Sequence, residues 1–295
     1  FLSRAGVAVT VFERKDDLGG IVRHVIPEFR IGREAIDRDV ALCKAYGAKF
    51  ELGVEVKSAD ELRAKGFTHV IFATGAWKPG AAGLDYGEEL NVISFLERAK
   101  KDPGSLKLGT DVVVIGGGNT AMDAARAAKR LPGVERVRLV YRRTKRYMPA
   151  DAEELALALM DGVECRELLA PVGVKDGVRT GSVMELGAPD ASGRRSPVAT
   201  GKTVEVPATA VITAVGEHVE EAPFTQSGVA LDRKGRPVVD EDMATGVPGV
   251  YAVGDARRGP ATVVEAIADA AKAAQAIVDL ELDKYTDRNI NPDYN

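Results

Sequence analysis

Residues 111–123 read DVVVIGGGNTAMD, and this stretch decides the fold. The apolar run at 111–115 predicts a buried strand, and the three glycines after it predict a tight turn. A helical pattern then extends to Arg130, a Pro-Gly turn follows at 132–133, and residues 137–141 predict the next strand. A strand, a glycine turn, a helix and a second strand in this order indicate a βαβ unit that binds a dinucleotide.

The glycine turn has the pattern G-x-G-x-x-A. Gly116 permits the tight turn out of the strand, Gly118 lets the backbone approach a pyrophosphate, and Ala121 allows the helix to pack closely on the strand. The first N–H groups of the helix and the positive end of its dipole favour phosphate at this position. The alternative is a glycine turn that serves packing alone.

The end of the next strand predicts which nicotinamide cofactor binds. Sites for NAD place an acidic residue there, whereas this chain has Arg142 and Arg143, followed by Lys145 and Arg146. Because a guanidinium group pairs well with a phosphate, we predict NADP(H), with Arg142 and Arg143 on its 2′-phosphate. The alternative is a solvated basic surface.

A second nucleotide site is predicted, but it is incomplete. Residues 7–12 predict a buried strand that ends at Glu13, where a carboxylate would hold a ribose, and a turn follows at Leu18-Gly19-Gly20. Residues 1–6 are typical of the end of a helix that follows a glycine-rich loop. We therefore expect the first strand of this domain and its G-x-G-x-x-G to be missing from the chain. The alternative for Glu13 is an exposed charge at a strand end.

The remaining pattern is that of an α/β protein. Strands are expected at 68–73, 210–215 and 250–253, hairpin strands within 170–207, and a long helix after Asp255. Cys43 falls on the apolar stripe of a helix that begins near Ile36, so we expect it in the core. Asp151 and its acidic neighbours are expected to cap the helix after Pro149.

Composition limits the classes of function. The chain has 45% hydrophobic and 28% charged residues, a formal net charge of −4, and no apolar run long enough to span a membrane. This balance argues against nucleic acid or an anionic membrane as a partner. Two distant cysteines without a C-x-x-C motif fit the cytoplasm, and they argue against a redox disulfide or an iron–sulfur site within the chain. We predict no metal site, because the three histidines have no ligand spacing.

Beyond these motifs, the chain resembles the small (beta) subunit of glutamate synthase and its relatives. These relatives include the N-terminal half of dihydropyrimidine dehydrogenase and proteins named as selenate reductase iron–sulfur subunits, and the last look most similar. The residues that show the resemblance occur in the family's order at 13–30, 73–75, 116–123, 141–143, 148–150, 214–216, 254–255 and 262–266.

The resemblance implies two sets of cofactor-binding residues and no catalytic acid or base. The FAD set is Glu13, Arg14, Gly19, Gly20, Ile21, Arg30, Val56, Thr74, Gly75, Gly254, Asp255, Thr262 and Val263. The NADPH set is Gly116, Gly118, Asn119, Thr120, Ala121, Arg142, Arg143, Ala214 and Gly216. Glu13 is expected on the adenosine ribose and Arg30 near the pyrophosphate or the flavin, while the N–H groups of Thr262 and Val263 face the flavin pyrimidine edge.

We accordingly predict two dinucleotide-binding (Rossmann-like) domains. The FAD domain comprises 1–78 and 219–283, the NADPH domain 79–218 is inserted into it, and 284–295 form a surface tail. The implied activity is that of an NADPH-dependent flavoprotein oxidoreductase, which passes electrons through FAD to an iron–sulfur domain or a catalytic subunit outside this chain. One alternative is an FAD-free fragment that only binds nucleotide or docks. A thioredoxin-reductase-like enzyme is another, although it would need a C-x-x-C pair.

Overall fold

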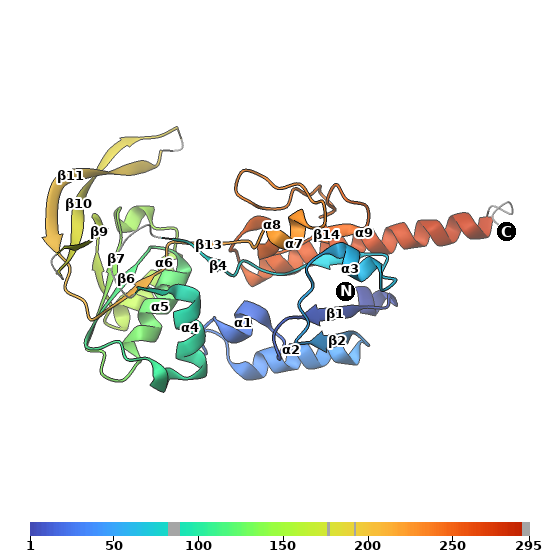
Figure 1. Ribbon diagram of the computed structural model, residues 1–295, viewed down its shortest axis with the longest axis horizontal. Helices are drawn as coiled ribbons and strands as arrows, with labels where there is room; N and C mark the ends of the chain where they lie inside the picture. Colours follow the sequence, from blue (N-terminus) through green and yellow to red (C-terminus); the bar gives the residue numbers. More distant parts are fainter. Residues whose placement is uncertain (82–88, 176–177, 192, 291–295) are drawn as a thin grey trace. The chain divides into compact units, whose positions relative to one another are not determined.

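The structure is a computed structural model that describes residues 1–81, 89–175, 178–191 and 193–290 (Figure 1). It divides into two compact units. The first unit comprises Phe1–Arg23, Gly32–Lys78 and Glu217–Asn295, and the second comprises His24–Ile31 and Pro79–Gly216. Along the described residues, no helix combines the length and the apolar character needed to cross a membrane.

The second unit is built around a parallel sheet of five strands in the order β5-β12-β6-β7-β8. Its strands are β5 (Glu89–Asn91), β6 (Asp111–Ile115), β7 (Arg136–Val140), β8 (Glu164–Arg166) and β12 (Ala210–Thr213). The sequence predicts β6, β7 and β12 because their near-continuous apolar residues are typical of strands covered on both faces. Val112 and Val114 are fully buried, as is Val137, the partner of Val112 on β7.

Helices cover one face of this sheet, and a second sheet covers the other (Figure 1). α5 (Asn119–Lys129) contacts both α4 (Val92–Lys101) and α6 (Ala152–Met160). On the opposite face, Val113, Ile115 and Val140 pack with Val206 and Leu169, which come from the neighbourhood of the antiparallel sheet. That sheet has the order β11-β10-β9 and consists of β9 (Leu169–Lys175), β10 (Val178–Pro189) and β11 (Arg195–Glu205). Short 3-10 helices lie at Pro103–Ser105 (η2) and Lys145–Tyr147 (η3).

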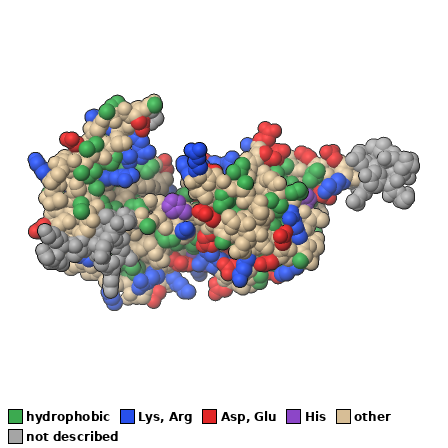
Figure 2. All heavy atoms as spheres, turned by 45° about the horizontal axis from the view of Figure 1, so that its top comes forward, with side chains coloured by type: hydrophobic (Ala, Val, Ile, Leu, Met, Phe, Trp, Pro, Cys, Tyr) green, Lys and Arg blue, Asp and Glu red, His purple; other side chains and the backbone are tan. Residues whose placement is uncertain are grey.

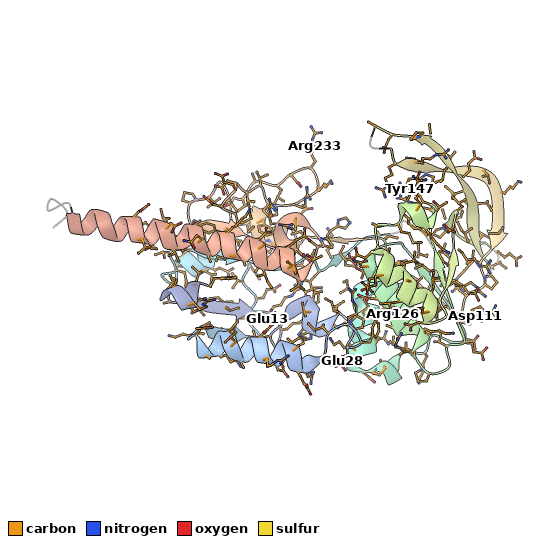
Figure 3. The ribbon with its side chains drawn as sticks, turned by 180° about the vertical axis from the view of Figure 1, so that it is seen from behind. Glu13, Glu28, Asp111, Arg126, Tyr147 and Arg233 are labelled. Carbon is orange, nitrogen blue, oxygen red and sulfur yellow. The ribbon has the colours of Figure 1, made fainter. Side chains whose placement is uncertain are left out.

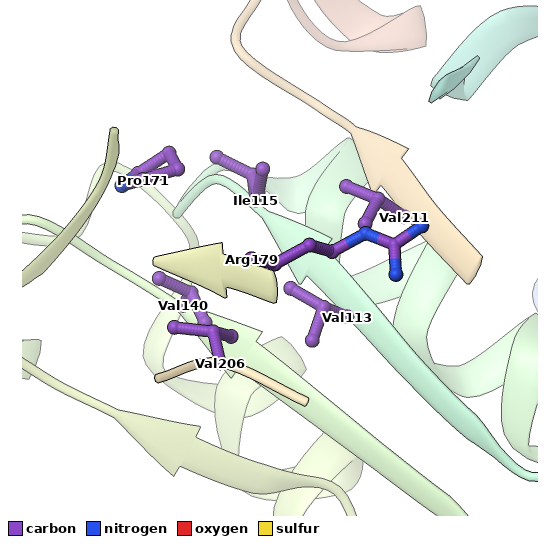
Figure 4. Close-up of a pocket in the computed structure, with 7 residues that line it drawn as sticks. All are labelled: Val113, Ile115, Val140, Pro171, Arg179, Val206 and Val211. Atoms are coloured by element: carbon purple, nitrogen blue, oxygen red, sulfur yellow. The ribbon is translucent and has the colours of Figure 1, made fainter. Parts of the chain in front are cut away.

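A small cavity of about 10 Å³ lies between the two sheets (Figure 4). The side chain of Arg179 crosses it, and its Nε is buried without a hydrogen-bond partner among the described residues. The other lining residues are apolar: Val113, Ile115, Val140, Pro171, Val206 and Val211. A volume of this size holds about one water molecule, so this cavity belongs to the packing of the unit and cannot hold a nucleotide.

The first unit has two separate pairs of parallel strands. β1 (Thr10–Glu13) pairs with β2 (Lys49–Leu52), and β3 (Val70–Phe72) pairs with β14 (Val250–Ala252). Its helices are η1 (Leu2–Ala5), α1 (Gly20–His24), α2 (Arg33–Ala45), α3 (Ala59–Arg63), α7 (Ala222–Thr225), α8 (Asp255–Arg258) and α9 (Val263–Ile290). β4 (Lys78–Pro79) and β13 (Glu217–His218) form a further pair. The core lies around β3 and β14, where Phe72 contacts Phe224 with 4.9 Å between the ring centroids.

Two features of the first unit differ from the expectations, and the first is the core position predicted for Cys43, which is wrong. Cys43 is exposed, as are its neighbours Leu42 and Tyr46, because the C-terminal half of α2 has little to pack against among the described residues. The second is residues 284–290, which are expected in a surface tail and which continue α9 as a helix. The apolar stripe marks the buried face of a helix, whereas the last turns of α9 are helical without an apolar stripe.

The third difference concerns residues 24–31. The sequence predicts them in the FAD domain, but their contacts lie in the second unit. Lys100 Nζ donates to the carbonyl oxygen of Ile26 at 2.6 Å. Phe29 lies under the guanidinium groups of Arg126 and Arg130, 4.5 and 4.4 Å from its ring centroid. These contacts with α4 and α5 explain why this short segment groups with the second unit although the chain on either side belongs to the first.

Candidate nucleotide-binding site

The glycine turn of the second unit connects β6 to α5. Gly116 has φ of +151°, and a Cβ there would overlap the carbonyl oxygen of Ala214. A Cβ on Gly117 would lie 2.5 Å from the ring of Tyr141. Gly118 differs, since no atom lies within 4 Å of the Cβ position. The first two glycines are therefore required by packing, whereas the third leaves open space where a ligand could approach the backbone.

The N-terminus of α5 begins at this open glycine. Gly118 is the N-cap, and no side chain caps the helix. The N–H groups of the first residues, Asn119 and Thr120, have no partner within the helix and add to the positive end of its dipole. Ala121 is fully buried against β6. A helix N-terminus of this kind can bind a pyrophosphate, and the predicted Gly118, Asn119, Thr120 and Ala121 lie at it.

Positive charge follows the end of the neighbouring strand β7. Arg142 is exposed and Arg143 is half-buried. Nε of Arg143 donates to the carbonyl oxygen of Arg195 at 3.1 Å, and its terminal nitrogens have no hydrogen bond within the described part of the chain. Figure 2 shows Lys and Arg side chains gathered on the second unit near the β10–β11 hairpin. These cations can pair with a phosphate.

Residues 141–151, here called the basic loop, connect β7 to α6 and return to the glycine turn. The hydroxyl of Tyr141 donates to the carbonyl oxygen of Tyr147 at 2.7 Å. The N–H of Ala150 donates to the carbonyl oxygen of Gly117 at 3.0 Å. Asp151 then exchanges two hydrogen bonds of 2.9 Å with Asn119. The sequence does not reveal these links, because a tyrosine at a strand end and an acid after Pro149 also occur in loops without them.

The last predicted residues of the second unit follow β12. Ala214 is buried, and its carbonyl oxygen lies against Gly116. Gly216 has φ of +109°, and its carbonyl oxygen accepts a hydrogen bond of 2.7 Å from the N–H of Gly80. β6, β7 and β12 are parallel neighbours, so Gly116, Arg142 and Ala214 lie at the carboxyl ends of adjacent strands. Ligands of open parallel sheets bind at this edge.

Predicted FAD residues of the first unit follow its strands in the same way. Glu13 ends β1 (Figure 3), and its Oε1 accepts a hydrogen bond of 2.8 Å from the N–H of Lys15. Arg14 makes an ion pair of 3.2 Å with Glu220. The others lie close to an element end: Gly19, Gly20 and Ile21 after β1, Val56 after β2, Thr74 and Gly75 after β3, and Gly254 and Asp255 after β14.

The backbone after β14 is fixed by a buried carboxylate. Gly254 has φ of +61°, and its N–H donates to Oδ2 of Asp269 at 3.2 Å. Asp269 also pairs with Arg258. Asp255 accepts a hydrogen bond from the N–H of Ala261 at 3.1 Å, and burial raises the pKa of its carboxyl group. This arrangement holds the start of α8 in the position where the sequence predicts a ribityl chain.

Thr262 and Val263 stand at the start of α9, as predicted, but the N–H of Thr262 is already engaged. It donates to Oε2 of Glu265 at 3.0 Å, and the N–H of Glu265 donates to Oγ1 of Thr262 at 3.2 Å. This reciprocal pair is a capping box. A flavin that used the Thr262 N–H would have to displace the Glu265 carboxylate.

Arg30 differs from its expected place. Its guanidinium group lies in the second unit, 3.2 Å from Asp123 of α5 and 2.9 Å from Glu154 of α6. Glu154 lies 3.5 Å from Arg126 as well. Burial raises the pKa of Asp123 to about 6, although the charge of Arg30 and its hydrogen bond act in the opposite direction. A role for Arg30 on FAD would require these ion pairs to break.

Comparison with known proteins supports the sequence-based resemblance. YgfK of Escherichia coli (strain K12), which is named as an oxidoreductase, is 44% identical over 303 residues, 99% of this chain and 29% of that protein. A protein of Cereibacter sphaeroides named as a glutamate synthase [NADPH] small chain is 38% identical over 94% of this chain and 72% of its own length. This chain thus spans less than a third of YgfK.

The fold is also that of solved structures. FprA of Mycobacterium tuberculosis in complex with NADPH superimposes with a TM-score of 0.76 at 20% identity, over 98% of this chain and 83% of FprA. The family model described as pyridine nucleotide-disulphide oxidoreductase matches residues 24–270. The predicted resemblance to the glutamate synthase small chain, and with it the prediction of an oxidoreductase, is confirmed. The chain belongs to the pyridine nucleotide-disulphide oxidoreductase family.

Proposed function

We propose that this chain is the NADPH-oxidising, FAD-binding part of a larger oxidoreductase. The observation that supports this most directly is the juxtaposition of an open glycine and helix N-terminus with Arg142 and Arg143 at the end of the adjacent strand. The backbone N–H groups suit the pyrophosphate, and the two guanidinium groups suit the 2′-phosphate that distinguishes NADPH from NADH. The nicotinamide half would then lie toward Ala214 and Gly216.

FAD is assigned to the first unit, where Glu13 would hold the adenosine ribose and Gly254 and Asp255 the ribityl chain. When both cofactors are bound, the nicotinamide supplies a hydride and the flavin accepts it. The residues of this chain bind and orient the two groups, and none of them is assigned as an acid or a base.

The divided sheet of the first unit supports the proposal that one strand is missing. Parallel sheets are stable when they are continuous and covered, yet β1–β2 and β3–β14 are separate pairs in the described residues. A parallel strand between β1 and β3 would join them into one five-stranded sheet of the dinucleotide-binding type. The turn after such a strand would bring the G-x-G-x-x-G that the sequence lacks. We propose that the longer protein supplies both.

The electrons are proposed to leave through an iron–sulfur domain or a partner subunit outside this chain. A relative bears the name of the small chain of glutamate synthase, and such a name implies a second chain in that protein. The two cysteines here, Cys43 and Cys165, cannot form a cluster, so an onward carrier would come from elsewhere. We place the protein in the cytoplasm on the same cysteine content.

The cofactor choice is tested by replacing Arg142 and Arg143 with Ala in the purified chain. Removing two charge-assisted phosphate contacts should weaken NADPH binding by about 10- to 100-fold and NADH binding by less than about 2-fold. Fluorescence of the bound reduced nicotinamide measures both. The matched control is R233A/K234A, which removes two adjacent exposed cations from a loop of the first unit (Figure 3). An equal loss for both nucleotides would exclude the 2′-phosphate assignment.

A second measurement separates the proposal from an FAD-free nucleotide-binding or docking module. Protein that is yellow, with a flavin spectrum, and that reduces ferricyanide with NADPH supports the flavoprotein. Colourless protein that binds NADPH and takes up no added FAD, alone or with the segment that precedes residue 1 in the longer protein, supports the module. A thioredoxin-reductase-like activity is disfavoured because the sequence has no C-x-x-C.

A further inference from the structure

The basic loop is attached to the glycine turn at both of its ends. At the start, the ring of Tyr141 packs on Gly117, and the residue is only 7% exposed. At the other end, the Ala150 N–H donates to the Gly117 carbonyl oxygen at 3.0 Å. The segment that bears the cations and the turn proposed to hold the pyrophosphate are therefore parts of one hydrogen-bonded structure.

Tyr141 also closes the loop on itself. Its hydroxyl donates to the carbonyl oxygen of Tyr147 at 2.7 Å, and Arg142 and Arg143 lie in the chain between these two residues. Tyr147 is labelled in Figure 3. The backbone between them is held further by Lys145, whose N–H donates to Glu167, and by Arg143, whose carbonyl oxygen accepts from the N–H of Leu168. The path of the chain at the two arginines is thus determined by hydrogen bonds at both sides.

The hydrogen-bond partner of the Asp151 side chain is unusual for its position. It occupies the N-cap position of α6, where an aspartate normally accepts a hydrogen bond from the helix backbone, but its side chain makes no such bond. Its carboxylate instead accepts from Nδ2 of Asn119 at 2.9 Å, while its N–H donates to Oδ1 of the same side chain at 2.9 Å. Asn119 is the first residue of α5, so Asp151 links the end of the basic loop to the helix N-terminus.

We propose that Tyr141 and Asp151 are positioning residues that hold the 2′-phosphate site at a fixed distance from the pyrophosphate site, and so set the preference for NADPH. This inference rests on the proposed function. NADPH gains affinity from both phosphate groups at once only if their two sites are correctly spaced before binding. NADH uses the pyrophosphate site alone, and its affinity should depend little on where the arginines lie.

The direction in which D151A changes the affinity for NADPH distinguishes a positioning role of Asp151 from a simple effect of its charge. Asp151 is a negative charge beside a site for phosphates, so charge alone predicts that D151A binds NADPH more tightly. If Asp151 acts through Asn119, D151A instead weakens NADPH by about 3- to 10-fold and leaves NADH within about 2-fold, since a lost hydrogen bond changes affinity by this amount. Y141F, which removes one oxygen, should weaken NADPH in the same selective way.

The experiment measures NADPH and NADH binding to the whole chain by fluorescence, with the melting temperature of each variant as a check on folding. Glu153→Ala is the matched control, because it removes an exposed charge from the same first turn of α6 without a bond to Asn119. D151N retains an oxygen that can accept from Asn119 and should restore most of the preference. The double variant N119A/D151A should bind no more weakly than N119A alone, because the two side chains act as one pair.

The outcomes separate this inference from the function on which it rests. If the unaltered chain does not prefer NADPH to NADH, the 2′-phosphate assignment fails and the inference fails with it. If the unaltered chain prefers NADPH and folded D151A and Y141F keep that preference, the inference alone is overturned. If D151A does not fold, Y141F decides the question, since it removes one oxygen and preserves the size of the ring.

Discussion

Nη1 of Arg30 lies 3.2 Å from both carboxylate oxygens of Asp123, and this pair links residues 24–31 to α5. Asp123 is 5% exposed, and Glu154 lies on the other side of the same guanidinium group. The carboxylates of Asp123 and Glu154 therefore share Arg30, and Arg126 also lies near Glu154. The free-energy cost of burying Asp123 as an anion is larger than its stabilisation by Arg30 and Arg126. The pKa of Asp123 is therefore raised to about 6.

The first prediction concerns stability against pH. Because the native state binds the Asp123 proton more tightly than the unfolded state, this group contributes stability at low pH, which is lost as pH rises from about 4 to about 6. The loss is on the order of 2–3 kcal/mol. Asp123→Asn removes the titration and can still accept from Arg30. Urea unfolding between pH 4 and 7 should show the difference between the two proteins changing across this window, and parallel curves would contradict the assignment.

The second prediction uses two glycines of one turn. Gly116→Ala forces a Cβ onto the Ala214 carbonyl oxygen and a residue with a side chain into φ of +151°, so it should lower stability by about 2 kcal/mol or more. Gly118→Ala meets open space at φ of −93° and should leave the melting temperature nearly unchanged. It should still weaken NADPH, because the new methyl group lies where the pyrophosphate is proposed to approach. Equal melting temperatures for the two variants would show that the turn does not pack as described.

The third prediction concerns the C-terminal half of α9. His69 Nε2 lies 2.9 Å from Oε1 of Glu281, and this hydrogen bond, followed by that of Lys284, lowers the pKa of Glu281 to about 2. A lowered carboxyl pKa contributes stability above about 4.5 that is lost as pH falls toward 2. In His69→Gln, NMR titration should show the Glu281 pKa rising toward 4.5. K284A is the control, and it should move the pKa less, because the His69 bond is the larger cause.

The fourth prediction concerns the capping box at the start of α9. Thr262→Ala removes the hydroxyl that accepts from the Glu265 N–H, and it should lower the free energy of unfolding by about 1 kcal/mol. Glu265→Gln keeps the shape of the box and should cost less. If FAD uses the Thr262 N–H, added FAD should bind Glu265→Ala at least as well as the unaltered chain. Much weaker binding to that variant would assign Glu265 a direct role on the flavin.

The second unit could be predicted well from sequence, because its signals are local. The apolar run at 111–115 and the glycines after it correspond to β6 and the turn into α5 within a residue or two. The sequence could not show that the Asp151 side chain, at the N-cap of α6, would bind Asn119, 32 residues away, instead of the helix backbone. It also predicted residues 24–31 in the FAD domain, whereas ion pairs of Arg30 to α5 and α6 link this segment to the second unit. Such long-range pairs have no periodic signature in the chain.

The first unit was harder to predict for a different reason. Cys43 lies on the apolar stripe of α2, yet it is exposed, because an apolar stripe is buried only where another element packs against it. Most residues expected to contact FAD do lie near the carboxyl ends of β1, β3 and β14, as the topology requires. Their assignment to FAD stays a prediction.

The two parallel strand pairs of the first unit have a practical consequence. β1 has one hydrogen-bonded neighbour, β2, and β3 has one, β14, so in the described residues each presents a free backbone edge. Free edges recruit further strands, either from a neighbouring segment of the same polypeptide or from another molecule. Concentration-dependent association of the purified chain through those edges is therefore expected.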